Sequence, residues 1–395
     1  MEKGKQHALR QKLDFMVLSM WVLTPWAMVF SKAALSIIVA LLAVGIIIKV
    51  SSPSETVEGS KYHPYFMLLA LVVVSGFWTH NTGHWIHLIN VSMPLLVYPI
   101  SYGQNKLLLS RNRNLVFHQF LWASLTLALY IVGLFIFKNE EIIELIKSGG
   151  SLALPNNHIR TSLIIAVTAI WSIHQWMTGK DSTIRPWIYG LAAVVVFLEL
   201  HFIAVRSGIV IGYFGLVIYL WRQWEHWRSN RLTVMLSLIL AVGISMIYFP
   251  FLQAKWQYWI EDIQNMDGFA WNYYSDAVRF KTMAMGIEIG QEHPIFGIGL
   301  GDVLDEMTLK FQIQDNIVLS KVIHNMFITW WAGSGFIGLG IALYALYIIG
   351  QRQRKKAMEW TVFWMIMVSC LVENTLQVYV GETLFVLFTV FSTDY

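Results

Sequence analysis

Three side chains with the chemistry of a polar site lie beside or between apolar runs of this sequence: Arg206, Arg279 and His324. An ionisable group near a membrane-spanning helix is costly unless it faces water, a partner or a substrate. Guanidinium groups bind phosphate oxygens through paired hydrogen bonds, and a neutral imidazole accepts protons near pH 7. These residue types therefore predict a site that binds a phosphate and removes a proton.

Each of the three residues also has a simpler interpretation. Arg206 precedes Ser207-Gly208 and fits an arginine at a helix end whose side chain reaches the membrane surface. Arg279 fits a solvated residue, or a partner of Asp276 one helical turn earlier. His324 fits a hydrogen-bonded residue that caps a helix. A common location on one side of a membrane would favour the site over these interpretations.

Two other polar groups are candidates for supporting roles. His80, His84 and His87 have the spacing that places residues on one helix face. A polar cavity wall is favoured over a metal site, because no Asp, Glu or Cys neighbours them in the sequence. Glu199 and His201 are expected to form a buried pair, because isolated charges are rarely tolerated within a membrane.

The composition is that of a membrane protein. Of the 395 residues, 56% are hydrophobic and 13% are charged, and the mean hydropathy of +0.55 excludes an ordinary water-soluble domain. The net charge of +4 is explained by basic residues in short loops and indicates no nucleic-acid partner. The single cysteine, Cys370, excludes an intrachain disulfide and a metal site built from cysteines.

Twelve apolar runs are long enough to cross a hydrocarbon core of about 30 Å. They lie at about 13–31, 33–50, 64–79, 84–102, 116–137, 161–178, 186–204, 208–222, 233–252, 323–349, 360–376 and 382–393. The predicted fold is an all-α polytopic membrane protein of about twelve transmembrane helices. Residues 1–395 are predicted to form a single transmembrane domain.

The basic residues predict the orientation. With the amino terminus in the cytoplasm, eighteen of the 28 Lys and Arg residues fall inside and five fall in short outside loops. Both termini are therefore expected to be cytoplasmic, and Arg206, Arg279 and His324 are expected to face the other side.

Two outside loops are longer than a turn. The first, 138–160, has an amphipathic pattern at 140–146 that predicts a short helix on the membrane surface. The second, 253–322, is a large loop between the ninth and tenth predicted helices and contains Arg279. Its turn at Pro294–Gly301 resembles a phosphate loop only superficially, because no Lys-Ser/Thr follows.

The whole pattern resembles the lipopolysaccharide O-antigen ligases, which belong to a superfamily with O-antigen polymerases and protein O-oligosaccharyltransferases. The features that carry the likeness are the twelve helices, the outside Arg206-Ser207-Gly208, Arg279 in a large outside loop, the Pro294-x-x-Gly297-x-Gly299 turn, and His324-Asn325-x9-Gly335-x-x-Gly338. Glu373 in Val372-Glu373-Asn374 and Gly381 are weaker matches. The His-Asn-Gly-Gly element is the most specific of these features.

The resemblance implies a membrane glycosyltransferase of the C type. Such enzymes move a glycan from undecaprenyl pyrophosphate to a sugar hydroxyl of the lipid A core oligosaccharide, in the bacterial inner membrane and on its periplasmic side, without metal or nucleotide. It implies Arg206 and Arg279 as pyrophosphate ligands, His324 as the general base of an inverting displacement, and Asn325 and Glu373 as further substrate-binding residues. No cofactor is expected, and membrane lipids are the surrounding partners.

Two alternatives remain open. An O-antigen polymerase uses the same donor with a second lipid-linked unit as acceptor. A twelve-helix transporter belongs to another class, and the absence of repeated halves and of paired broken helices in the sequence disfavours it. A protein O-oligosaccharyltransferase is disfavoured because no large extra outside domain is present.

Overall fold

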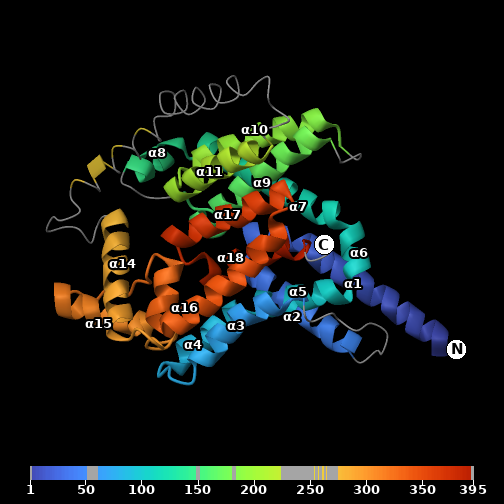
Figure 1. The fold of residues 1–395 in the computed structure, drawn as a ribbon. Coiled ribbons are helices and arrows are strands. Elements are labelled where there is room, and N and C mark those ends of the chain that lie inside the picture. Colours follow the sequence, from blue (N-terminus) through green and yellow to red (C-terminus); the bar gives the residue numbers. More distant parts are fainter. Residues whose placement is uncertain are drawn as a thin grey trace. The chain divides into compact units, whose positions relative to one another are not determined.

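A computed structural model describes residues 2–50, 61–147, 152–179, 184–223 and 275–392, and the single positions 253, 257, 260, 261 and 264 (Figure 1). All regular structure in these residues is helical. The helices are α1 (Glu2–Phe30), α2 (Lys32–Val50), α3 (His63–Ser75), α4 (Thr82–Val91), α5 (Pro94–Gln104), α6 (Lys106–Arg111), α7 (Arg113–Phe137), α8 (Asn139–Lys147), α9 (His158–Thr178), α10 (Pro186–Ile203), α11 (Arg206–Arg222), α14 (Ser275–Glu292), α15 (Val303–Asp315), α16 (Met326–Gln353), α17 (Ala357–Val372), the 3-10 helix η3 (Thr375–Gln377) and α18 (Tyr379–Val390).

Within the described part of the chain, five helices are long and apolar enough to cross a membrane: α1, α2, α7, α10 and α16. Shorter apolar helices are α3, α17 and α18. This confirms an all-α polytopic membrane protein, while the count of twelve spans stays a prediction. The predicted helix 233–252 and most of the first part of the loop 253–322 lie outside the described residues.

The predicted helix 84–102 is wrong in one respect, because the structure divides it into α4 and α5. The chain turns at Ser92 and Met93, and α5 begins at Pro94. Proline lacks an N–H and its ring clashes with the carbonyl four residues earlier, so it is accepted at the first position of a new helix and not in a helix interior.

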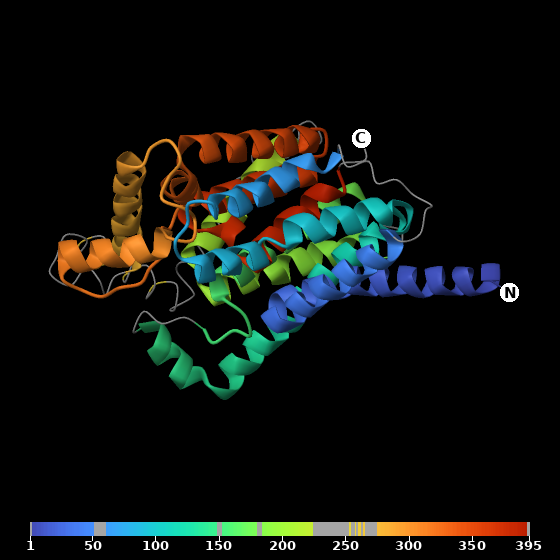
Figure 2. The ribbon, with the colours of Figure 1, turned by 90° about the horizontal axis from the view of Figure 1, so that it is seen from below.

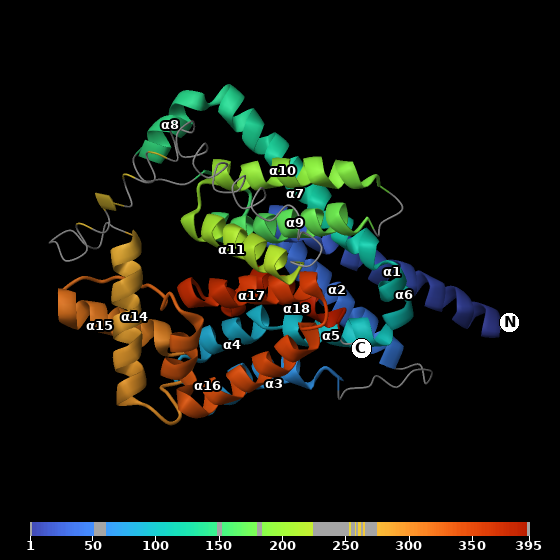
Figure 3. The same ribbon diagram turned by 45° about the horizontal axis from the view of Figure 1, so that its top comes forward.

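The chain forms two compact units. The first contains residues 1–119, 279–355 and 366–395, and the second contains 120–278 and 356–365. In the first unit α3 packs beside α16, and α5 packs against α2 and α18. In the second, α9 packs against both α10 and α11 (Figure 3).

The amphipathic pattern at 140–146 does form a helix, α8, in the second unit. Its Glu140, Glu141 and Glu144 are exposed, whereas Ile142 is buried against Leu152. The helix is thus confirmed, and its location on a membrane surface stays a prediction.

Helix α16 is interrupted at Gly335, and a loop from elsewhere in the first unit packs against this break. Gly335 has φ of 64° and ψ of −171°, which leaves backbone groups without helical partners. The loop that follows α14 supplies them: Ile298 and Gly299 donate N–H groups to the carbonyls of Ala332 and Gly333 at 3.0 and 2.9 Å. In return, the Phe336 N–H donates to the Pro294 carbonyl at 2.8 Å.

These contacts explain the glycines of the motif. A Cβ on Gly335 would lie 2.1 Å from the Ile295 backbone, and one on Gly297 would lie 2.4 Å from the Gly333 carbonyl carbon. Gly297 and Gly335 also have positive φ, a conformation that other residues rarely adopt. The Pro294–Gly299 turn is therefore a docking element for α16, and its backbone groups are used by the protein itself.

Helices α14 and α15 follow each other along the chain and cross steeply (Figure 2). Three ion pairs join them: Lys281–Asp315 at 3.0 Å, Lys310–Glu292 at 2.8 Å and Lys310–Glu288 at 3.5 Å. Burial of Lys310 lowers the pKa of its amine, but the hydrogen bond and charge of Glu292 outweigh this and the net pKa is raised. These pairs fix α14 and α15 to each other.

Candidate active site

The start of α16 fixes the position of His324. Asn325 is the N-cap residue, because its side-chain oxygen accepts the N–H groups of Phe327 and Ile328 at 3.0 Å each. Its amide nitrogen donates to the Leu371 carbonyl at 3.0 Å, which ties the end of α17 to the start of α16. The interpretation of His324 as the helix cap is therefore wrong, and the Asn325 amide is occupied at both ends by structural contacts.

Glu373 lies where α17 has ended. The predicted helix 360–376 is too long, because α17 stops at Val372 and the next residues turn into η3. The hydroxyls of Ser369 and Thr375 lie 2.6 Å apart across this break. Polar side chains that bond one another locally offer the backbone an alternative to helix continuation.

In the first unit, Glu373 connects the two candidate residues Arg279 and His324. Its Oε1 lies 2.7 Å from Arg279 Nη2, and its Oε2 lies 3.5 Å from His324 Nδ1. The Glu373 side chain is 5% exposed, and the other two are 22% and 18% exposed. One buried carboxylate therefore faces both a guanidinium and an imidazole.

Thr282 makes a second link between α14 and His324, besides the one from Arg279 through Glu373. Its hydroxyl donates to the Arg279 carbonyl at 2.8 Å, and the same oxygen accepts the His324 backbone N–H at 3.4 Å. Because the backbones of both functional residues contact one buried hydroxyl, their separation is set by packing as well as by the ion pair. The interpretation of Arg279 as a solvated loop residue is wrong.

Arg206 is held in the second unit. It is the first residue of α11, and its Nη1 lies 2.7 Å from Asp276 Oδ2. The side chains are 29% and 16% exposed. Arg206 is thus half-buried in an ion pair, and its grouping with Arg279 and His324 in one site stays a prediction.

The two groups that were predicted to have supporting roles, the three histidines and the Glu199–His201 pair, are arranged differently in the structure. Helix α4 begins at Thr82, so His80 precedes it and contacts Asp302 at 3.2 Å, whereas His84 and His87 stack on the helix with ring centroids 6.0 Å apart. The expected pair of Glu199 and His201 is wrong.

His201 lies 3.0 Å from the Tyr213 hydroxyl and 2.8 Å from the Phe197 carbonyl. Both oxygens of Glu199 are buried with no hydrogen-bond partner among the described residues. Residues two apart on a helix point to different sides, which prevents Glu199 and His201 from pairing.

No group of three or more His, Cys, Asp or Glu residues in the described chain is arranged to hold a metal ion. The chemistry available at Arg279, Glu373 and His324 is that of a cation beside an acid and a proton acceptor. Such a set stabilises a negatively charged leaving group and removes a proton from a hydroxyl.

Part of the chain matches a known family. Residues 191–343 match the family model described as O-antigen ligase. Over these residues the chain is similar to the O-antigen ligase family. Arg206, Arg279 and His324 lie within the match, as do the Pro294–Gly299 turn and the break at Gly335.

Members of this family are O-antigen ligases or polymerases, which are glycosyltransferase-like enzymes. The family and the five apolar helices indicate a multi-pass membrane protein of O-antigen biosynthesis. No curated protein matches the chain.

Sequence reasoning gave Glu373 too small a role. It entered as a weak match, although the structure makes it the link between Arg279 and His324. One signal was present: Val372-Glu373-Asn374 places a carboxylate and an amide at the end of an apolar run. Such a polar interruption is where a helix ends and where a side chain is free to face a site.

Proposed function

We propose that this protein transfers O-antigen polysaccharide from undecaprenyl pyrophosphate to a sugar hydroxyl of the lipid A core oligosaccharide. The reaction takes place at the periplasmic face of the inner membrane, inverts the anomeric carbon and requires no metal. The observation that carries the proposal is the Glu373 carboxylate between Arg279 and His324, in a chain whose residues 191–343 match the O-antigen ligase family model.

Arg279 binds the pyrophosphate of the donor in this proposal. The carboxylate of Glu373 contacts the guanidinium at 2.7 Å in the structure, and a phosphate likewise presents two acceptor oxygens that a guanidinium can bind as a pair. The donor therefore competes with Glu373 for Arg279. Arg206, paired with Asp276 in the same manner, is proposed as the second pyrophosphate ligand.

His324 is the general base. Its Nδ1 faces Glu373, so the imidazolium that forms when the ring takes the acceptor's proton is stabilised by a carboxylate, and Nε2 is the nitrogen that faces the hydroxyl. The oxygen of the acceptor forms a bond to the anomeric carbon as the bond from that carbon to the pyrophosphate oxygen breaks. The positive end of α16, which begins at Met326, favours the negative charge that develops nearby.

The test is a reconstituted transfer reaction. Purified protein is incubated with undecaprenyl-pyrophosphate-linked glycan and rough lipopolysaccharide in the presence of a chelator, with His324→Ala as the inactive variant and His87→Ala as the matched control. Glycosylated lipopolysaccharide is expected with wild type and control only. Extension of lipid-linked glycan without rough lipopolysaccharide would identify a polymerase instead, and transfer that stops with chelator would refute the metal-independent mechanism.

A further inference from the structure

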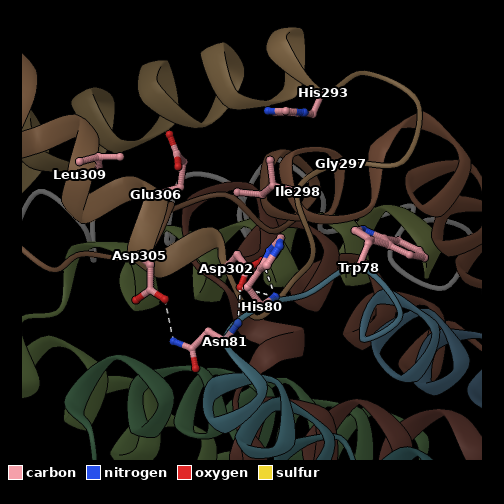
Figure 4. A pocket seen from close by; sticks show the side chains of 10 residues that line it. All are labelled: Trp78, His80, Asn81, His293, Gly297, Ile298, Asp302, Asp305, Glu306 and Leu309. Atoms are coloured by element: carbon pink, nitrogen blue, oxygen red, sulfur yellow. Dashed lines mark hydrogen bonds and ion pairs between the residues drawn. The ribbon is translucent and has the colours of Figure 1, made fainter.

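A second polar region of the first unit, separate from His324, is a pocket of about 520 Å³ (Figure 4). Three segments form it: the chain before α4, the turn after α14, and the first two turns of α15. The lining residues are Trp78, His80, Asn81, His293, Gly297, Ile298, Asp302, Asp305, Glu306 and Leu309.

The walls of this pocket are fixed by the protein's own contacts. Both oxygens of Asp302 accept the backbone N–H of His80, at 3.0 and 2.8 Å, and Oδ1 also accepts that of Asn81 at 2.6 Å. Asp305 accepts the Asn81 amide at 2.7 Å. The hollow is therefore present before any ligand enters, which lowers the ordering cost of binding.

Other polar groups of the lining are free to meet a ligand. The Glu306 carboxylate and the His293 ring form no hydrogen bond or ion pair with another described residue. Both point into the hollow in Figure 4, from α15 and from the end of α14. A free acceptor beside an imidazole suits hydroxyl groups, which both donate and accept hydrogen bonds.

The remaining lining is apolar. Trp78, Ile298 and Leu309 supply surfaces that fit the C–H faces of a sugar ring. The lining contains three carboxylates and no Lys or Arg, so a phosphate or an acidic sugar would be repelled. The chemistry matches an uncharged sugar or an amino sugar.

The turn that forms one wall is bonded to the helix that follows His324. Gly299 donates to the carbonyl of Gly333, which lies nine residues after His324. The part from Met326 to Gly333 lies in α16, and at about 1.5 Å of rise per residue it spans roughly 10 Å along the helix. A glycan whose reducing end is at His324 would need more than one sugar to reach Gly333, where the wall of the pocket is bonded to α16.

We propose that this pocket binds an uncharged or amino sugar of the donor glycan, remote from the bond that is transferred. The proposal rests on the proposed function and adds a subsite that recognises the polymer rather than the pyrophosphate. Glycan binding here would hold a sugar remote from the carrier while the reducing end of the donor reacts.

The experiment compares two donors in the transfer reaction: undecaprenyl pyrophosphate carrying several repeat units, and the same carrier with one sugar. The pocket variant is Glu306→Ala, and the control that removes a carboxylate elsewhere is Glu144→Ala on α8, where the side chain is exposed. Loss of a charge-assisted hydrogen bond is expected to raise KM for the long donor about tenfold. KM for the one-sugar donor, KM for the acceptor, and kcat at saturation are expected to match wild type.

Three results would overturn the proposal: an unchanged KM for the long donor, an equal rise for both donors, or a rise in the acceptor's KM alone. If wild type transfers no glycan at all, the proposed function fails but the pocket is still tested. The glycan released from the donor by mild acid should then bind wild type and Glu144→Ala, and bind Glu306→Ala about tenfold more weakly. Equal binding, or none to wild type, would refute the pocket.

Discussion

Two arginine–carboxylate pairs, one in each compact unit, differ in what the carboxylate also faces. Arg279–Glu373 and Arg206–Asp276 both have N–O distances of 2.7 Å. Glu373 is 5% exposed and lies 3.5 Å from His324, whereas Asp276 is 16% exposed. The first pair is therefore expected to affect proton transfer, while the second is expected to act on donor binding only.

The Arg279–Glu373 pair is the more buried of the two, and its loss is expected to cost more. Removal of one partner of a buried pair leaves the other charge without compensation, and the cost grows with burial. A variant at Arg279 is thus expected to disturb both the pyrophosphate contact and the carboxylate at His324. A variant at Arg206 is expected to lose a phosphate contact alone.

The largest effect is expected at the proton acceptor. His324→Ala should reduce kcat about 100- to 10,000-fold, because that is the usual contribution of a general base. Donor binding, measured in parallel, should be retained because the arginines remain. His324→Gln should not restore transfer, since an amide takes up no proton at neutral pH; near-normal turnover of that variant would make Glu373 the next candidate base.

Arg279→Ala should cause the second-largest loss of activity. Loss of a charge-assisted phosphate contact costs roughly 1.5–3 kcal/mol, or about tenfold to a hundredfold in rate, and the unpaired Glu373 should place this variant at the upper end. Arg279→Lys keeps the charge without the paired geometry and should recover only part of the activity. Wild-type kcat/KM in a well-expressed Arg279→Ala protein would refute pyrophosphate binding by this residue.

Glu373→Gln should cause the third-largest loss of activity, and it distinguishes the roles of the two arginine–carboxylate pairs most directly. The amide keeps the shape but no longer stabilises an imidazolium, so kcat should fall about tenfold. KM for the donor should fall or stay constant, because the competitor for Arg279 is weakened. A rise in donor KM with normal kcat would mean that Glu373 binds substrate, as the sequence resemblance implies.

Arg206→Ala should have the smallest effect on catalysis, about tenfold on kcat/KM and mainly through donor KM. Asp276→Asn should leave kcat unchanged, which is the counterpart of the Glu373→Gln result. Equal losses of kcat in the two carboxylate variants would show that the pairs are equivalent and would refute the division of roles.

The last prediction concerns the side of the membrane and should leave activity unchanged. In a Cys370→Ser background, Ser320→Cys lies on an exposed segment before His324, and Lys355→Cys lies on the exposed segment after α16. An impermeant maleimide should label Ser320→Cys in intact spheroplasts and Lys355→Cys only after lysis. The reverse pattern would invert the orientation and place His324 in the cytoplasm.

Much of the helical framework was predictable because hydropathy records locally which segments avoid water. The apolar runs at 116–137, 161–178 and 186–204 correspond closely to α7, α9 and α10. The predicted helices 84–102 and 360–376 both continue past a break in the structure. The average hydropathy of a segment does not show a proline that starts a new helix, or polar side chains that bond one another. The family was also recognisable from sequence, because its motif is local.

By itself, then, the sequence predicted an all-helical membrane protein that resembles the O-antigen ligases, with Arg206, Arg279 and His324 as candidate site residues. Tertiary structure alone decided that Glu373, 94 residues from Arg279, bonds it and faces His324. It also decided that the Pro294–Gly299 turn fills the break in α16. The physical reason is that hydropathy and helix propensity act over a few residues, whereas the partner of a buried charge or a free carbonyl depends on which distant segments pack together.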